Sequence, residues 1–187
     1  MLDQIAKYRQ LVTLNDGTRV LFRPLVKEDR AALLAFFEPI GQDDFRLMRN
    51  NVRDPQVLAD WVDHLDYRRT LPIVAVVNDR IAGDATLHFR QGPGRHVADV
   101  RIFLSKEFRR RGLGVAMLRT VIDVARKLGL QQLVAEVVAD QVKTITAFQS
   151  LGFELRATYP DYFMFPDGET QDVAILILRL ASKKEEF

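Results

Sequence analysis

The 187-residue sequence contains no cysteine. This absence excludes disulfide frameworks, thiolate nucleophiles and thiolate metal sites, and it is compatible with a reducing compartment. The histidines, His64, His88 and His96, show no metal-ligand spacing, so we expect no metal. No stretch approaches the roughly 20 apolar residues that a membrane span needs. These absences predict a cytoplasmic protein that does not engage a membrane.

The net charge of the sequence is also small. The sequence has 27 Lys and Arg against 25 Asp and Glu, which leaves a formal charge of +2. A balance this close to neutral does not predict nucleic-acid binding over the whole surface, so we expect no nucleic-acid partner. The length is ordinary for one domain, and no repeat, low-complexity tract or linker divides the chain. We therefore treat residues 1–187 as a single domain.

The N-terminal third predicts a hairpin followed by helices. Asn15-Asp16-Gly17 separates two short strand-like runs, and Asp-Gly is typical of a tight hairpin turn. Apolar residues spaced by three predict a helix over residues 27–37, packed on a sheet. We expect a second helix over residues 55–64.

The centre and the C-terminal part alternate between strands and helices. Strands over residues 72–77 and 81–89 are expected to form an antiparallel hairpin. The further elements that the patterns predict are a strand over 97–104, a helix from Leu113 capped by Gly129, a strand over 133–138, a helix over 141–151 with Asp140 as its N-cap, and a strand over 172–178. This order predicts an α/β (α+β) fold, with a mixed sheet and helices on both of its faces.

The most informative segment is the turn after strand 97–104. It reads Arg109-Arg110-Arg111-Gly112-Leu113-Gly114 and leads directly into an amphipathic helix. A helix start carries unpaired N–H groups and a positive dipole end, so it favours phosphate, and glycine lets phosphate approach the backbone closely. The sequence contains no Gly-Lys-Ser or Gly-Lys-Thr, so it lacks the Walker motif of nucleotide hydrolases. It also lacks the Rossmann motif of dinucleotide-binding proteins, because Met117 occupies the position of the third glycine.

At these residues the sequence resembles the GNAT acetyltransferase superfamily, whose signature is Gln or Arg, two residues, Gly, one residue, then Gly or Ala. Arg109-x-x-Gly112-x-Gly114 matches it, and Leu151-Gly152-Phe153 resembles the end of the family's next helix. The resemblance implies a mostly antiparallel sheet with splayed central strands and acetyl-CoA as acyl donor. The cofactor-binding residues it implies are the main chain of Ile102 and Leu104 for the pantetheine arm, the backbone of Arg109, Arg110, Arg111, Gly112, Leu113, Gly114 and Val115 for the pyrophosphate, and Gln141, where the family commonly has Asn.

A narrower resemblance, to the acetyltransferase domain of bacterial protein lysine acetyltransferases, covers nearly the whole chain. It rests on residues such as Asp16-Gly17, Arg23-Pro24-Leu25 and Phe36-Phe37. It implies N-terminal elements over residues 1–70, a CoA-binding core over 71–152 and an acceptor-side segment over 153–180. The aromatic stretch over residues 159–168 either walls the acceptor site or simply packs.

Direct acetyl transfer needs a neutral amine, whereas a lysine side chain has a pKa of about 10.4. A base must therefore take the proton, and the position that matches the family's catalytic glutamate is Asp99. Arg101, on the same face, favours the ionised carboxylate, and an Asp99–Arg101 ion pair that serves only the sheet is the alternative. Phe148 stands where many relatives place a general-acid tyrosine, so that role has no candidate.

The sequence thus predicts an acetyl-CoA-dependent N-acetyltransferase, with a protein lysine as the favoured acceptor. A small-molecule amine acceptor is the first alternative. A module that senses acetyl-CoA without turnover is the second, because Asp99 replaces Glu and Phe148 replaces Tyr. A nucleic-acid binder using the arginine run ranks last. No residue decides the acceptor, the acyl chain length or the oligomeric state.

Overall fold

The structure is a computed structural model that describes residues 2–180. Its strands are β1 (Gln10–Thr13), β2 (Arg19–Pro24), β3 (Thr70–Val77), β4 (Arg80–Phe89), β5 (Val97–Leu104), β6 (Gln132–Val138), β7 (Glu154–Met164) and β8 (Thr170–Arg179). Its helices are α1 (Leu2–Ala6), α2 (Arg30–Phe37), α3 (Gln42–Arg46), α4 (Pro55–Asp63), α5 (Leu113–Lys127) and α6 (Val142–Gln149). Short 3-10 turns precede α2, β5 and the α5 turn.

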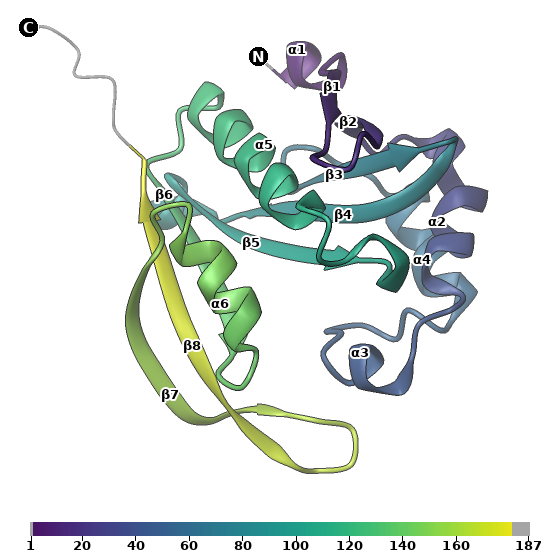
Figure 1. Ribbon diagram of the computed structural model, residues 1–187. Coiled ribbons are helices and arrows are strands. Elements are labelled where there is room, and N and C mark those ends of the chain that lie inside the picture. The colour runs from purple at the N-terminus through teal and green to yellow at the C-terminus, as the bar shows by residue number, and fades with distance from the viewer. Residues whose placement is uncertain (1, 181–187) are drawn as a thin grey trace, which may run out of the picture.

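The strands form one sheet in the order β1-β2-β3-β4-β5-β6-β8-β7 (Figure 1). Neighbouring strands are antiparallel except β5 and β6, which are parallel. α5 and α6 cover one face of the sheet, and α2 and α4 cover the other. The predicted mixed, mostly antiparallel fold with helices on both faces is confirmed. None of the described helices combines the length and apolarity that crossing a membrane requires.

The two central strands separate after a short parallel contact. β5 and β6 pair from Val97↔Gln132 to Asp99↔Val134, and then both continue without a ladder between them. Along the separated part, β5 is still held by β4 on its other edge, and β6 by β8. The backbone groups that face the gap are therefore left to pair with something other than the neighbouring strand.

Glycine permits the turn that leads into α5. Gly112 is the N-cap and has a φ of +83°, which side chains rarely adopt. Gly114 lies so close to β5 that an added Cβ would be 3.2 Å from Leu104 Cδ1. The first turn of α5 therefore lies directly against the end of β5. At the other end of α5, Gly129 has a φ of +76° and confirms the predicted cap.

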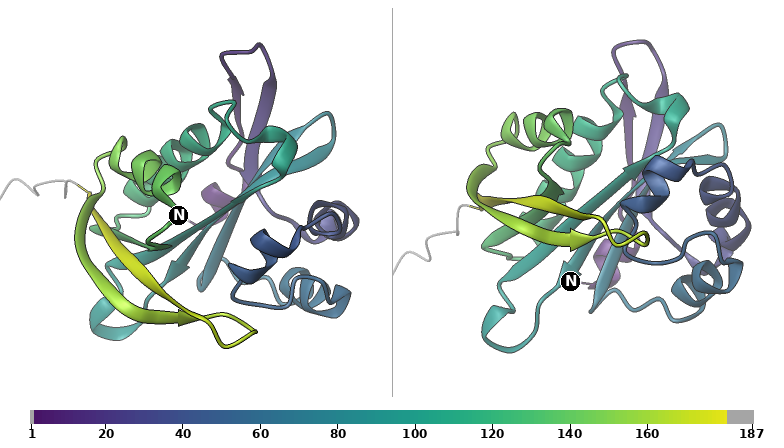
Figure 2. Two further views of the ribbon diagram at one scale, coloured as in Figure 1. Left: turned by 60° about the horizontal axis from the view of Figure 1, so that its bottom comes forward. Right: turned by 90° about the horizontal axis from the view of Figure 1, so that it is seen from below.

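The sequence analysis missed β7. Pro160 and Asp161 interrupt its pattern, Asp161 has a φ of +50°, and the register with β8 shifts between Tyr159 and Phe163. The β7–β8 hairpin extends toward α3 (Figure 2). Arg46 of α3 bonds to Glu169 at 2.6 Å, so the hairpin is tied to the other side of the molecule.

The predicted N-cap of α6 was wrong. The N-cap is Gln141 rather than Asp140, and no side chain caps this helix. Asp140 instead accepts a hydrogen bond from the Gln141 side chain at 3.2 Å, so its carboxylate is directed away from the helix N–H groups. The predicted helix over residues 27–37 is divided into a 3-10 turn (Lys27–Asp29) and α2.

Candidate active site

The turn between β5 and α5 suits an anionic group. N–H groups in the first turn of a helix have no partner inside the helix, and those of α5 open onto the turn. Nothing lies within 4 Å of a Cβ placed on Gly112, so the backbone there is accessible from outside. The residues present therefore fit the pyrophosphate that the sequence assigned to the backbone from Arg109 to Val115.

The three arginines of this turn have different surroundings. Arg109 donates to the Leu104 carbonyl oxygen from Nε and Nη2, at 3.1 and 2.9 Å, and to Asp44 at 2.8 Å. Arg111 donates to Asp16 and Thr18, both at 2.6 Å, and so attaches the turn to the β1–β2 hairpin. Arg110 is exposed, and its side chain has no partner among residues 2–180. Arg109 and Arg111 thus brace the turn, and Arg110 remains available to an anion.

The gap between β5 and β6 presents main-chain groups to a ligand. Ser105 N–H bonds to the Ala82 carbonyl at 3.0 Å, on the β4 side of the strand. Because backbone groups alternate in direction along a strand, Ile102 and Leu104 direct theirs toward the gap. The Leu104 carbonyl is already occupied by Arg109, so Leu104 contributes its N–H and Ile102 contributes both groups.

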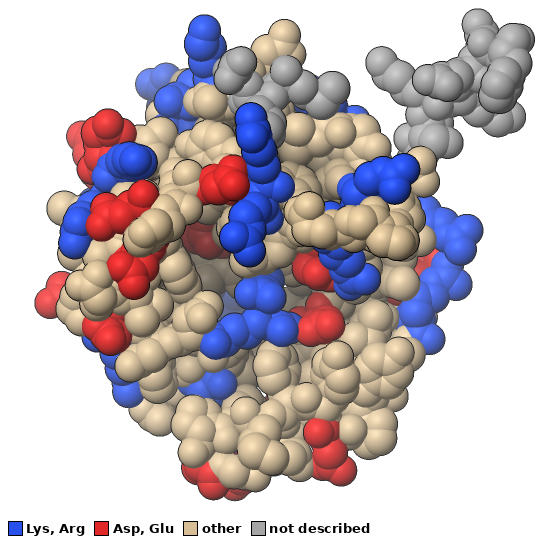
Figure 3. Space-filling model, turned by 180° about the vertical axis from the view of Figure 1, so that it is seen from behind, with Lys and Arg blue, Asp and Glu red and all other residues tan. Residues whose placement is uncertain are grey.

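A cavity of about 530 Å³ opens beside this gap, on the face that α2 and α4 cover. This face is hollowed, and basic side chains border the hollow (Figure 3). The sheet forms the floor of the cavity. The walls come from α2, the α3–α4 segment, α4 and β7, and their side chains include Phe37, Arg49, Asn50, Trp61 and Phe163. The volume is typical of a small-molecule site.

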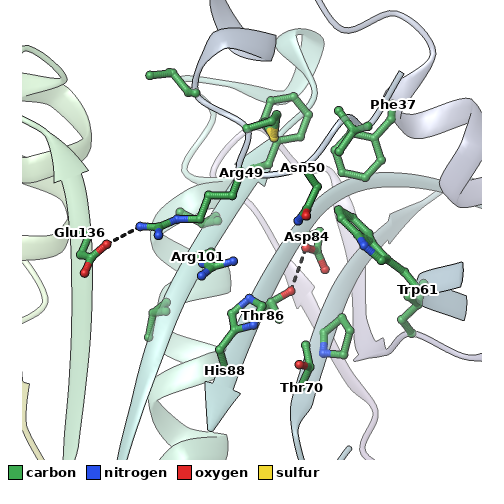
Figure 4. A pocket seen from close by; sticks show the side chains of 18 of the residues that line it. Phe37, Arg49, Asn50, Trp61, Thr70, Asp84, Thr86, His88, Arg101 and Glu136 are labelled. Atoms are coloured by element: carbon green, nitrogen blue, oxygen red, sulfur yellow. Dashed lines mark hydrogen bonds and ion pairs between the residues drawn. The ribbon is translucent and has the colours of Figure 1, made fainter. Parts of the chain in front are cut away.

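Asp84 is a buried carboxyl group on the floor of this cavity (Figure 4). Thr86 donates to its Oδ2 at 2.9 Å, whereas its Oδ1 has no hydrogen-bond partner within the described chain. Burial raises the pKa of Asp84 to about 7, and the Thr86 hydrogen bond offsets only part of this effect. A carboxyl group with such a pKa and an unused oxygen can accept a proton near neutral pH.

Other polar side chains that line the same cavity include His88, Arg101, Arg49 and Glu136. Burial, reinforced by the charge of Arg101, lowers the pKa of His88 to about 4, so His88 is neutral at pH 7. Burial and the nearby Arg49 lower the pKa of Arg101. Arg49 extends across the cavity to Glu136 on β6, with which it forms an ion pair (Figure 4).

Asp99, the predicted base, lies on the same face of β5 as Arg101 but is paired elsewhere. Arg90 holds both of its oxygens, from Nε at 3.1 Å and from Nη2 at 2.6 Å. The Asp99–Arg101 ion pair that the sequence offered as an alternative does not form. The side chain of Asp99 is 31% exposed and is not part of the cavity wall.

Of the other predicted positions, Ile102 and Gln141 line the cavity. Phe148 is buried, with its ring 4.9 Å from that of Phe153, as expected of a packing residue. From the segment over residues 159–168, Phe163 lines the cavity. Among residues 2–180, no group of His, Asp and Glu side chains is arranged to hold a metal ion.

The sequence analysis missed Asp84 and Glu136, and a signal for both was present. Each interrupts an otherwise apolar strand, in Ile81-Ala82-Gly83-Asp84-Ala85 and Leu133-Val134-Ala135-Glu136-Val137. A charged residue inside a buried strand is unusual unless it is paired or functional. Glu136 is paired with Arg49, and Asp84 has no charged partner within hydrogen-bond reach.

Comparisons with known proteins agree with this geometry. The chain is 28% identical over 130 residues to an acetyltransferase of Pseudomonas aeruginosa, covering 65% of this chain and 67% of that protein. It is 28% identical over 115 residues to an L-amino acid N-acetyltransferase of Escherichia coli, covering 60% and 70%. A shorter match, 32% identical over 80 residues, joins it to an E. coli N-acetyltransferase for the alanine of ribosomal protein bS18, and covers 43% and 53%.

Solved structures share the fold. The GNAT domain of S. lividans PAT superposes with a TM-score of 0.77 at 21% identity, over 94% of this chain and 98% of that one. An acetyltransferase of Salmonella typhimurium, solved with acetyl-CoA, superposes with a TM-score of 0.72 at 22% identity, over 87% and 94%. The family match itself spans residues 33–153, which is more than half of the sequence. This chain therefore belongs to the acetyltransferase (GNAT) family, whose acyl donor is acetyl-CoA.

Proposed function

We propose that this enzyme transfers the acetyl group of acetyl-CoA to a primary amine held in the cavity, with Asp84 as the general base. The observation that carries this proposal is the position of Asp84, a buried carboxyl group with an unpartnered oxygen. Asp84 lies opposite Phe103 in the β4–β5 register, beside the separated part of β5. The base is thus one strand away from the gap that suits the pantetheine arm.

Different residues of the site act at different steps of the proposed reaction. The Asp84 carboxylate takes a proton from the acceptor ammonium, directly or through water, and leaves a neutral amine. The amine nitrogen then bonds to the acetyl carbonyl carbon, the carbon–sulfur bond breaks and CoA leaves as its thiolate. The second proton that the nitrogen loses on becoming an amide passes through solvent to that thiolate. Leu104 N–H, which is directed into the gap, is suited to stabilise the negative charge that develops on the carbonyl oxygen. Asp84 then releases its proton to solvent.

The cavity favours a small amine over the protein lysine that the sequence suggested. The Arg49–Glu136 ion pair crosses the cavity, and Phe37 and Trp61 close another side (Figure 4). A small molecule fits behind these groups without moving them. Protein lysine, supported by the resemblance of the N-terminal third, is the second candidate.

We also propose that the protein is located in the cytoplasm, because its sequence contains no cysteine.

A matched pair of variants tests the base. We expect Asp84→Asn to lower kcat by about 100-fold or more while CoA binding is retained. Asp99→Asn is the control, because it makes the same change on the same sheet face at a carboxylate that Arg90 occupies. The measurement is thiol release from acetyl-CoA with small amines and lysine peptides between pH 5.5 and 9.

The outcomes separate the candidates. Loss of turnover in Asp84→Asn alone supports the proposal, and loss in Asp99→Asn alone returns the role to the residue predicted from the sequence. Turnover of lysine peptides without turnover of any small amine would overturn the small-acceptor proposal. Tight CoA binding with no turnover on any amine would favour the sensing module.

A further inference from the structure

Arg101 is a charged residue of the cavity that no other part of the chain explains. It lies on β5 directly opposite Thr86 of β4, and its side chain projects into the cavity (Figure 4). It is half-buried, yet its guanidinium has no hydrogen bond or ion pair among residues 2–180. Removing a guanidinium from water without a partner is costly. An anionic ligand would supply the hydrogen-bond and ion-pair partner that the guanidinium lacks within the described chain.

Arg101 has no ion-pair partner among the neighbouring charged side chains. Asp99 and Glu136 are the nearby carboxylates, and they are held by Arg90 and Arg49 respectively. His88, beside Arg101, is neutral at pH 7. Arg49 and Arg90 are therefore each paired with a carboxylate, whereas Arg101 is not. The other carboxyl group near Arg101 is Asp84, which forms no ion pair with it.

Asp84 and Arg101 are close enough for one small molecule to reach both. In the β4–β5 register Asp84 is opposite Phe103, and Thr86 is opposite Arg101, so the two residues are diagonal neighbours on one face. Diagonal neighbours on adjacent strands have Cα atoms roughly 7–8 Å apart. An acceptor whose amine and anionic group are separated by one or two carbons can span this interval once both side chains reach toward it.

One part of the cavity wall is apolar. Phe37 stacks on Phe103 with ring centroids 5.5 Å apart, and Trp61 meets the edge of Phe37 at 6.0 Å. Met48 lines the cavity beside them. The rings of Phe37, Phe103 and Trp61 can bury a hydrocarbon side chain.

We propose that Arg101 binds the carboxylate of the acceptor, so that the substrate is a free α-amino acid with an apolar side chain. Its ammonium group faces Asp84, its carboxylate accepts hydrogen bonds from the Arg101 guanidinium, and its side chain lies against Phe37 and Trp61. This inference rests on the proposed function. It excludes the N-terminus of a polypeptide as the preferred acceptor, because there the carboxylate is replaced by an amide.

Three acceptors test the inference: L-phenylalanine, L-phenylalaninamide and 2-phenylethylamine. We expect the wild type to favour phenylalanine in kcat/KM over both of the others. The amide loses the anionic oxygens, and its amine is more easily deprotonated than that of the acid. A preference for the acid therefore cannot come from the amine itself.

Arg101→Gln should raise KM for phenylalanine by about 10-fold or more, with little change for 2-phenylethylamine. Arg101→Lys, which keeps the charge but not the planar donors, should recover part of the loss. Arg126→Gln is the control, because this arginine is paired with Asp123 on α5 and does not line the cavity. Thermal unfolding and CoA titration of each variant separate an effect on the acceptor from a loss of structure.

Equal turnover of the three acceptors by the wild type, or an equal effect of Arg101→Gln on all three, would overturn this inference while the proposed function stands. Absence of turnover on every small amine, with turnover of lysine peptides, would instead overturn the proposed function. The two failures are therefore distinguishable in one assay.

Discussion

Replacing Asp84 by asparagine should stabilise the protein, and increasingly so as the pH rises. In the folded chain the pKa of Asp84 is raised from 3.8 to about 7, so folding holds a proton that the unfolded chain releases. A raised carboxyl pKa therefore costs stability as the pH rises from 3.8 through 7. At about 1.4 kcal/mol for each tenfold change in proton affinity, the cost is about 2 kcal/mol at pH 5 and about 4 kcal/mol at pH 8.

Asparagine has nearly the same shape and never ionises, so Asp84→Asn removes this cost. Urea unfolding of both proteins at intervals from pH 5 to pH 8 measures the difference, which should grow by about 2 to 3 kcal/mol across the range. The slope with pH is the diagnostic, because any fixed effect of the amide on Thr86 is the same at every pH. Asp99→Asn should differ from the wild type by a constant amount. A difference for Asp84→Asn that does not change with pH would refute the argument.

Two further predictions concern the β5–α5 turn, which we propose binds phosphate. Gly112→Ala and Gly129→Ala place the same strain at opposite ends of α5, because both glycines have positive φ and neither has an atom within 4 Å of an added Cβ. Each should lower the free energy of unfolding by about 1 kcal/mol, but calorimetry should show weaker CoA binding only for Gly112→Ala; equal CoA affinities would contradict the assignment of the turn. Arg110→Gln should weaken CoA binding at low salt without changing stability. Arg111→Gln, which loses its contacts to Asp16 and Thr18, should instead lower the free energy of unfolding; the reverse pattern would show that Arg111 holds the phosphate.

Elements with strong local signals were predictable from the sequence. β5 begins and ends where its alternation predicted, because strict period-two patterning marks a strand with two different faces. α5 begins at Leu113 as predicted, since the Gly-x-Gly turn leaves few other helix starts. These two elements position the backbone to which we assign CoA, so that half of the proposed site could be predicted from the sequence.

The acceptor half was not accessible in the same way. Its groups come from β4, β5, β6 and the α3–α4 segment, and only the tertiary arrangement shows which charges pair. The sequence places Asp99 two residues from Arg101, which made that pair the natural expectation. In the fold Arg90 reaches Asp99 from the preceding strand end, and this long-range pairing leaves Arg101 without a partner.

Asp84 and Asp99 lie on the same face of the sheet, but their different hydrogen-bond partners give them different chemistry. To accept a proton, Asp99 would have to give up part of a two-point contact with Arg90, whereas Asp84 has an oxygen that no group of the described chain occupies. Burial gives Asp84 a high proton affinity, and its position on β4 is one strand away from the β5–β6 gap to which we assign the donor. Because Asp84 has no charged partner within hydrogen-bond reach, its ionised form lowers the stability of the fold. For the same reason its carboxylate is free to accept a proton and to act as a base.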